Sequence, residues 1–432
     1  MTVAPDFFET EPRNWRARLA TSVEVMKELS RYSDPQQMYA VFARRMYQLF
    51  PVSRQISISR RGLRFPQYRV TRFNLWTDPV NPWKETHRLP VHEGGLLAGL
   101  LYADQPRLIE DLILSPDDPA NEYLAGQRSL LAIPHYDQGT AHNAVILARE
   151  DPAAFPRDRI PDLVLLSNLF GRATQTLVLS QAAKEAYDAV DYELRTIADI
   201  QRSLLPAATP RVPGLDVAVH YQTATRAGGD YYDFFPLPDD RLGVLVADAS
   251  GHGAPAAVLM AIAHSIAHSL PEPPAGAGQL LTHLNAHLTR RYTRQTGNFM
   301  TAFYAIFDPA NGRLSYSSAG HNPPRLLRAA DGSRAALNRS QRLPLGIRPD
   351  EVYPDQETTL DRGDQVVFFT DGVIEAVSTE GDVFGPGRID AALATAPPTA
   401  ELLIQSILRS LTTFTAGTPV ADDRTLVVVR RE

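Results

Sequence analysis

The feature that most constrains this chain is residues 181–205, which contain neither Gly nor Pro although the 432 residues include 26 Gly and 34 Pro. Without these helix breakers, and with apolar positions alternately four and three apart, the stretch is expected to be one helix. Its seam is Ala183, Tyr187, Val190, Leu194, Ile197, Gln201 and Leu204. Such a seam fits either a helix packed on its own domain or a parallel two-stranded coiled coil in a dimer.

This helix predicts three parts: a domain over residues 21–180, a linker helix over 181–206, and a second domain over 207–432. A chain of this length is expected to form about two domains. In the first part, helical spacing over 21–50 and 162–179 flanks strand patterns over 53–76, 129–134 and 144–148, which indicates an α+β domain.

The second part is rich in strand patterns. Strands are predicted at 217–220, 242–247, 301–307, 314–318, 365–369 and 425–430, and helices at 255–270, 278–292 and 399–414. Because two long helices are adjacent in sequence, the pattern favours stacked sheets flanked by helices, an α+β arrangement, over a βαβ repeat.

Composition excludes several classes of protein. The chain has no Cys, which rules out thiolate catalysis, thiolate zinc sites and disulfides. A net charge of −6 without a basic tract makes a nucleic-acid partner unexpected. No apolar run reaches the roughly 18 residues that span a bilayer, and Met1–Arg13 lack the apolar core of a secretion signal. We therefore expect a cytoplasmic protein with no membrane association.

Acidic residues recur at strand ends in the second part. Asp230 follows Gly228-Gly229, Asp248 ends an apolar run, Asp371 precedes Gly372, and Asp422-Asp423 precede the last strand. Taken singly, each is most simply a turn residue. If they gather in one cleft, their mutual repulsion requires cations, and an oxygen-only ligand set selects Mg²⁺ or Mn²⁺. Two such ions about 3.5–4 Å apart could activate water for phosphoryl chemistry.

Eight short motifs occur in order along this part. They are IQRSLLP (200–206), GGDYYDF (228–234), VADASGHG (246–253), NFMTA (298–302), SAGHNPP (318–324), PLG (344–346), FTDGVIEA (369–376) and DDRT (422–425). With these motifs, residues from about 190 to 432 resemble the metal-dependent protein phosphatase (PPM) superfamily in its SpoIIE-like branch.

The resemblance implies a β-sandwich flanked by helices that hydrolyses phosphoserine and phosphothreonine with two Mn²⁺ or Mg²⁺ ions. It implies that Asp248 bridges both metals and that Asp230, with the backbone carbonyl of Ala249, binds the second. Asp371 and Asp422 would bind the first metal. All four carboxylates are present, as in an active member.

Other residues near these motifs allow two interpretations. His252 is a candidate general acid or a loop residue between two glycines. Asp233 and Asp423 are candidates for carboxylates that orient metal ligands or waters. Arg226 is a candidate phosphate-binding residue or a solvated loop charge.

Residues from about 21 to 180 resemble a GAF domain, a class that senses small ligands or dimerises. The absence of Cys excludes a thioether-linked bilin, and the sequence identifies no ligand. We therefore expect a homodimer formed through this domain and the linker helix.

The leading hypothesis is a regulated protein serine/threonine phosphatase acting on a phosphorylated STAS-type anti-sigma-factor antagonist, as the resemblance implies. The linker helix would transmit the signal of the N-terminal domain. The alternatives are a non-catalytic signalling scaffold with this fold and a small-molecule phosphatase. The chain contains no G-x-x-x-x-G-K-[ST] motif, so nucleotide binding has no sequence support.

Overall fold

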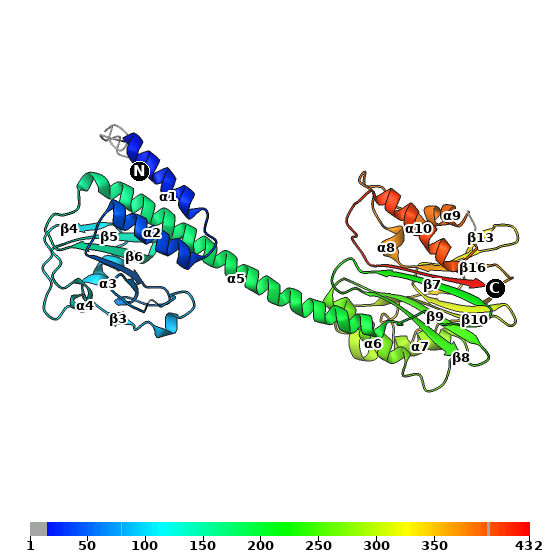
Figure 1. The fold of residues 1–432 in the computed structure, drawn as a ribbon. Helices are drawn as coiled ribbons and strands as arrows, with labels where there is room; N and C mark the ends of the chain where they lie inside the picture. Colours follow the sequence, from blue (N-terminus) through cyan, green and yellow to red (C-terminus); the bar gives the residue numbers. More distant parts are fainter. Residues whose placement is uncertain (1–14, 79, 395–397) are drawn as a thin grey trace, which may run out of the picture. The chain divides into compact units, whose positions relative to one another are not determined.

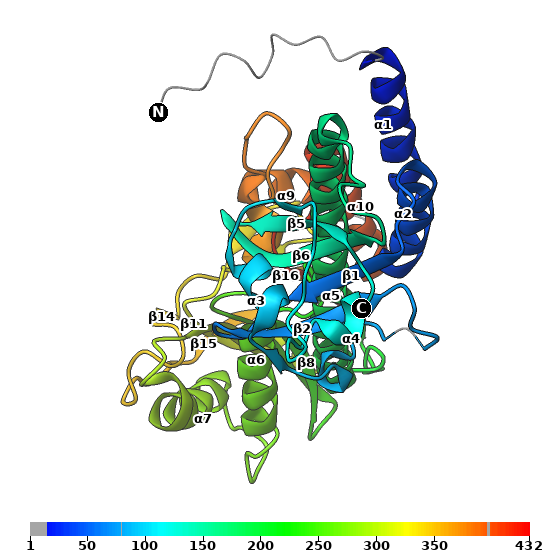
Figure 2. The ribbon, with the colours of Figure 1, turned by 90° about the vertical axis from the view of Figure 1, so that its left-hand side faces the viewer.

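The computed structural model describes residues 15–78, 80–394 and 398–432, which form two compact units with a boundary between Tyr187 and Asp188. Figures 1 and 2 show these units from two directions. The expectation about a secretion signal concerns Met1–Arg13, which lie outside the described residues. No helix in the described part of the chain is long and apolar enough to cross a membrane.

The N-terminal unit is a six-stranded antiparallel sheet of order β3-β2-β1-β6-β5-β4 with helices on both faces (Figure 1). Its helices are α1 (Trp15–Leu29), α2 (Pro35–Leu49), η2 (Thr86–Arg88), α3 (Gly95–Tyr102), α4 (Asn121–Leu124), η3 (Arg157–Arg159) and the beginning of α5 (Ile160–Leu204). Its strands are β1 (Arg54–Ser59), β2 (Gln67–Phe73), β3 (His92–Glu93), β4 (Arg107–Ile109), β5 (Ser129–Asp137) and β6 (Thr140–Arg149).

Two apolar cores hold this unit together, one on each face of the sheet. Helices α1, α2 and α5 bury Val25, Phe42 and Phe170 against one face, and the rings of Phe42 and Phe170 stack at 4.0 Å. Helices α3 and α4 cover the other face through residues such as Leu97 and Leu124. The helices and strands predicted for residues 21–180 are present, and the sequence pattern missed helices α3 and α4, the short turns η2 and η3, and the short strands β3 and β4.

Local sequence explains several element ends. The Asp34 carboxylate accepts a hydrogen bond from the Gln37 backbone N–H at 2.8 Å, and Pro35 opens α2. The turn between β5 and β6 uses Gln138 and Gly139, both at positive φ.

The predicted helices 162–179 and 181–205 are one continuous helix, α5, of 45 residues. The linker is therefore the second part of a helix that begins in the N-terminal unit. Its heptad seam divides in two. Tyr187 and Val190 are 69% and 56% exposed, whereas Gln201 is only 3% exposed and is packed on the C-terminal unit. The packed-helix interpretation thus holds for the end of the seam, and the exposed part stays available for the coiled-coil interpretation.

The C-terminal unit contains two sheets packed face to face, with helices outside each (Figure 1). One sheet has the order β14-β11-β10-β9-β8, with β15 paired to β11, and the other has the order β13-β12-β16-β17-β7. The strands are β7 (Leu215–Gln222), β8 (Asp230–Leu237), β9 (Arg241–Ala249), β10 (Met300–Asp308), β11 (Arg313–Ala319), β12 (Arg325–Leu327), β13 (Arg334–Ala336), β14 (Gln341–Arg342), β15 (Gln356–Thr359), β16 (Gln365–Phe369) and β17 (Arg424–Arg431). The helices are α6 (Ala254–Ala267), α7 (Ala277–Leu288), the π-helical turn η4 (Thr289–Thr293), α8 (Asp371–Ile374), α9 (Gly385–Leu393) and α10 (Ala400–Thr415).

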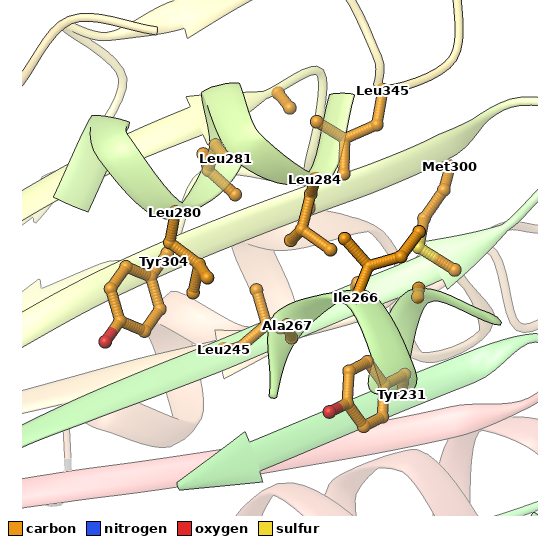
Figure 3. Packing of buried hydrophobic residues seen from close by; sticks show 14 of the residues in the cluster. Tyr231, Leu245, Ile266, Ala267, Leu280, Leu281, Leu284, Met300, Tyr304 and Leu345 are labelled. Carbon is orange, nitrogen blue, oxygen red and sulfur yellow. The ribbon is translucent and has the colours of Figure 1, made fainter. Parts of the chain in front are cut away.

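Three cores define the layers of this unit. Phe234, Val246 and Phe368 belong to the core between the sheets. Helices α6 and α7 cover the outer face of the first sheet, where Leu284 and Ile266 pack over the strands (Figure 3). Helices α8, α9 and α10 cover the outer face of the second sheet. The expected α+β sandwich flanked by helices is confirmed.

Candidate active site

Strand pairing brings the first two acidic residues together. Strands β8 and β9 are antiparallel, and Asp230 is the register partner of Asp248. Alternate residues of β8, Tyr232 and Phe234, belong to the core between the sheets. Because side chains alternate along a strand, Asp230 faces the same interior at the edge of the sandwich.

The second sheet brings the other aspartates to this edge. Strands β16 and β17 are antiparallel neighbours, so Asp371, which begins α8 two residues after the end of β16, lies near Asp422, which precedes β17. The hydroxyls of Thr370 and Thr425 donate hydrogen bonds to Asp230 Oδ2 at 2.7 and 2.5 Å. These two bonds join the sheets, and they hold the Asp230 carboxylate in one orientation.

The acidic side chains strongly perturb one another. Burial raises the pKa of Asp230 above its usual value, although the threonine hydrogen bonds oppose this shift. Burial also raises the pKa of Asp248, and the charges of Asp230, Asp371 and Asp422 raise it further. The pKa of Asp371 is raised by burial and then by Asp422. The cluster is therefore crowded with carboxylates that repel one another.

The backbone approaches this cluster closely at Gly229. A Cβ atom there would lie 2.7 Å from the Ala249 carbonyl oxygen and 3.1 Å from Asp248 Oδ1, so a side chain would fill the space between them. The buried Asp423 carboxylate fixes the same segment, because it accepts hydrogen bonds from the backbone N–H groups of Gly229 at 2.6 Å and Ala224 at 2.8 Å. Asp423 therefore holds the backbone beside Asp230, and its role in orienting metal ligands or waters stays a prediction.

The donor set fits a hard divalent cation. Four carboxylates and the neighbouring Ala249 carbonyl supply oxygen ligands alone, which is the chemistry that Mg²⁺ and Mn²⁺ prefer. Asp230 and Asp248 are mostly buried, whereas Asp422 is exposed, so the cluster opens to solvent at one side. A bound cation would neutralise the repulsion that raises the carboxylate pKa values.

Three candidates lie apart from this cluster or stay undecided. Asp233 is on the opposite face of β8, where its carboxylate contacts Tyr231, His264 and His268, so the structure does not support its expected role beside the metal ligands. Arg226 is half exposed and forms an ion pair with Asp191 of α5 at 2.9 Å. His252 is exposed between Gly251 and Gly253, both at positive φ, a geometry that fits a tight turn.

Gln201 supports the site in a way that the sequence interpretation missed, as it missed the contacts of Thr370 and Thr425 with Asp230. The Gln201 side chain on α5 donates to the Gly228 carbonyl at 2.7 Å and accepts from the Gly228 N–H at 3.0 Å. It thus fixes the loop that leads into Asp230. The available signal was that Gln201 is the one polar position of an otherwise apolar seam.

Comparisons with known proteins identify a family and several relatives that this chain resembles. The family described as Stage II sporulation protein E (SpoIIE) matches residues 238–432. Over 240 residues the chain is 30% identical to the phosphoserine phosphatase RsbU of Bacillus subtilis. The aligned region covers 56% of this chain and 70% of RsbU. Over 275 residues it is 28% identical to the protein IcfG of Synechocystis, which covers 58% of this chain and 43% of IcfG.

Among solved structures, the SiaA-PP2C domain of Pseudomonas aeruginosa shares the fold, with a TM-score of 0.50 and 20% identity. The match covers 57% of this chain and 99% of that domain. The matched fold, the motif order and the acidic cluster agree with one another. The chain therefore belongs to the SpoIIE family of PP2C-type protein serine/threonine phosphatases.

Proposed function

We propose that the chain hydrolyses phosphoserine and phosphothreonine in a protein substrate, with two Mn²⁺ or Mg²⁺ ions held by Asp230, Asp248, Asp371 and Asp422. The Ala249 carbonyl would complete the ligands of one ion. The observation that carries this proposal is the convergence of these aspartates, from both sheets, on one open edge of the sandwich. When bound, such ions would lower the pKa of water and stabilise negative charge on a phosphoryl group.

The chain's own residues would position this chemistry. Thr370 and Thr425 hold the Asp230 carboxylate, and Asp423 holds the Gly229 backbone. Gly229 leaves the space that the Ala249 carbonyl and Asp248 share. Since no side chain of this group must form a covalent bond to phosphorus, the absence of Cys is compatible with the reaction.

For the substrate, we propose a serine-phosphorylated STAS-type anti-sigma-factor antagonist. The support is the likeness to RsbU, named a phosphoserine phosphatase. We further propose that the N-terminal unit is a GAF-like sensor and that α5 pairs with a second copy. The exposed Tyr187 and Val190 of its heptad seam support this pairing, and the contact of Gln201 with Gly228 would connect the helix to the Asp230 loop.

The test is phosphate release from a phosphoserine STAS-type protein and from p-nitrophenyl phosphate, with and without Mn²⁺. Asp371→Asn is the site variant, and Asp350→Asn, at an exposed surface aspartate, is the matched control. We expect Mn²⁺-dependent release from the phosphoprotein by the wild type and the control, and loss of release in Asp371→Asn. Release from the small ester alone would support a small-molecule phosphatase. No release by the folded, metal-loaded protein from any phosphoprotein offered would support a scaffold.

A further inference from the structure

A second cluster of metal-binding side chains lies on the outer face of β8, against helix α6. His268 Nε2 is 2.7 Å from Asp233 Oδ2, and His264 Nδ1 is 3.6 Å from the same oxygen. One ligand atom from each of the three residues lies within 4.8 Å of the others. Among the described residues, this is the one group of three or more His and acidic side chains that meets this distance.

The secondary structure places these groups together. His264 and His268 are four residues apart, so they lie one turn apart on the same side of a helix, and their ring centroids are 4.5 Å apart. Asp233 and Tyr231 alternate with the inward-facing residues of β8 and therefore point toward α6. Tyr231 belongs to the apolar core beneath this helix, as Figure 3 shows.

The Asp233 carboxylate is held in place by its neighbours. Its Oδ1 accepts a hydrogen bond from the Phe234 backbone N–H at 2.7 Å, and its Oδ2 accepts one from the Tyr231 hydroxyl at 2.5 Å. The Tyr231 hydroxyl also lies 3.1 Å from His264 Nδ1. Both oxygens of this carboxylate are therefore oriented by hydrogen bonds, and Oδ2 also faces two imidazoles. Such partners strengthen metal binding because they orient the ligand.

The three side chains of this cluster differ in their exposure to solvent. The side chain of Asp233 is 7% exposed, that of His264 22%, and that of His268 47%. A metal ion could therefore enter from solvent at His268, and water could occupy the remaining coordination position. Three protein ligands with one open position is a common arrangement for zinc.

We propose that Asp233, His264 and His268 form a binding site for a zinc-class transition metal, separate from the acidic cluster. Two imidazoles and one carboxylate favour Zn²⁺, Co²⁺ or Ni²⁺, whereas the acidic cluster offers only oxygen and favours Mg²⁺ or Mn²⁺. The side chains of Asp230 and Asp233 leave opposite faces of β8, so the two sets share no ligand. The ion would cross-link β8 to α6 and stabilise this helix layer.

The test uses Co²⁺ as a spectroscopic probe on the full chain, in excess Mg²⁺ so that the acidic cluster is occupied. We expect a visible absorption band typical of four- or five-coordinate Co²⁺, saturating at about one ion per chain and removed by Zn²⁺. In His268→Gln and His264→Gln the affinity should fall at least about 100-fold, and in Tyr231→Phe about tenfold.

The matched control is His287→Gln. His283 and His287 on α7 have the same spacing and the same ring separation of 4.5 Å, but within the part of the chain that the structure describes they belong to no such group with a carboxylate. The control should bind Co²⁺ as the wild type does. His268 is half exposed, so its substitution should leave the fold intact, which circular dichroism would verify. Absence of the band in the wild type, or an equal band in His268→Gln and His287→Gln, would overturn the proposal.

Discussion

Strand β8 carries two aspartates three positions apart, and their surroundings differ completely. Asp230 faces the space between the sheets, where it meets two threonine hydroxyls and three further aspartates. Asp233 faces the helix layer, where it meets a tyrosine and two histidines. The pleat of one strand thus separates an oxygen-only ligand set from a mixed nitrogen and oxygen set. Both residues are aspartates, and the face of β8 from which each side chain points determines which set of ligands it joins.

The largest expected effect is a loss of phosphate release when a residue of the acidic cluster is substituted. Asp248→Asn should lower phosphate release about a thousandfold or more, equivalent to about 4 kcal/mol, because it removes a proposed bridging ligand. The control Asp350→Asn should retain activity, since its carboxylate is exposed and forms a surface ion pair with Arg348. In the metal-free protein, Asp248→Asn should raise the Tm, because one crowded, buried carboxylate is removed.

Calorimetry with and without Mn²⁺ measures the second part of this prediction. The wild type should gain stability from Mn²⁺, and the variant should gain little. A variant that keeps both its turnover and its Mn²⁺-dependent rise in Tm would show that the metals bind elsewhere, and the contrast between the faces of β8 would lose its basis.

The next largest effect concerns the pH dependence of stability. It contrasts the histidines of the proposed metal site with His135 in the N-terminal unit. His135 in the N-terminal unit is partly buried, its Nε2 lies 2.7 Å from Ser167 Oγ, and burial lowers its pKa to about 4. As pH falls below 6.5, the unfolded chain takes up the proton first. Stability is therefore fully present above pH 6.5 and is lost as pH falls toward 4, by about 3 kcal/mol at most.

Differential scanning calorimetry of the full chain at pH 7 and pH 4.5 measures this loss. His135→Gln cannot take up a proton, so the unit that contains it should lose less stability on acidification than in the wild type. Equal acid sensitivity of the variant and the wild type would mean that His135 is not the responsible group.

The third effect concerns the backbone that the acidic face requires. Gly229→Ala should cost about 2 kcal/mol, because its Cβ would lie 2.7 Å from the Ala249 carbonyl oxygen and force β8 and β9 apart. Activity should fall with it, since the same oxygen is a proposed ligand. The matched control is Gly387→Ala in α9, where no atom lies within 4 Å of the added Cβ apart from the adjacent residues and the backbone of its own helix, among the residues that the structure describes. Thermal unfolding should show that the control has the stability of the wild type or slightly more. Its rate of phosphate release should equal that of the wild type.

The sequence predicted the acidic cluster better than it predicted the supporting residues. The linear pattern places Asp230, Asp248, Asp371 and Asp422 at strand ends and turns, and the resemblance of the surrounding motifs to the phosphatase family is what implies that they form one set. Proximity in sequence groups Asp233 with them, because the sequence pattern predicts no strand over residues 230–237. Once β8 is known, the alternation of side chains alone separates Asp233 from Asp230.

Long-range contacts explain what the sequence could not reveal. Thr370 and Thr425 reach Asp230 from 140 and 195 residues away, across the packed sheets. The heptad pattern places Gln201 in a dimer or packing seam, whereas in the structure its side-chain amide contacts the Gly228 backbone. Such roles depend on how one element docks on another, and periodicity within an element carries no information on that docking.

The smallest expected effect decides between the two interpretations of Arg226. Its guanidinium is paired with Asp191, which also pairs with Arg195 at 2.7 Å, and it is about half exposed. Exposed ion pairs contribute at most about 1 kcal/mol, so Arg226→Gln should change stability little.

If Arg226 only fixes α5 to the loop before Asp230, KM of the Arg226→Gln variant for the phosphoprotein should stay within about twofold of the wild type. The reason is that the variant then loses a weak ion pair and no contact with the substrate. A rise in KM of about tenfold or more, with kcat retained, would instead show that Arg226 leaves Asp191 to bind the phosphate. Asp191→Asn distinguishes the cases further, because it breaks the pair but leaves the guanidinium free, and it should reproduce Arg226→Gln only if the ion pair itself matters.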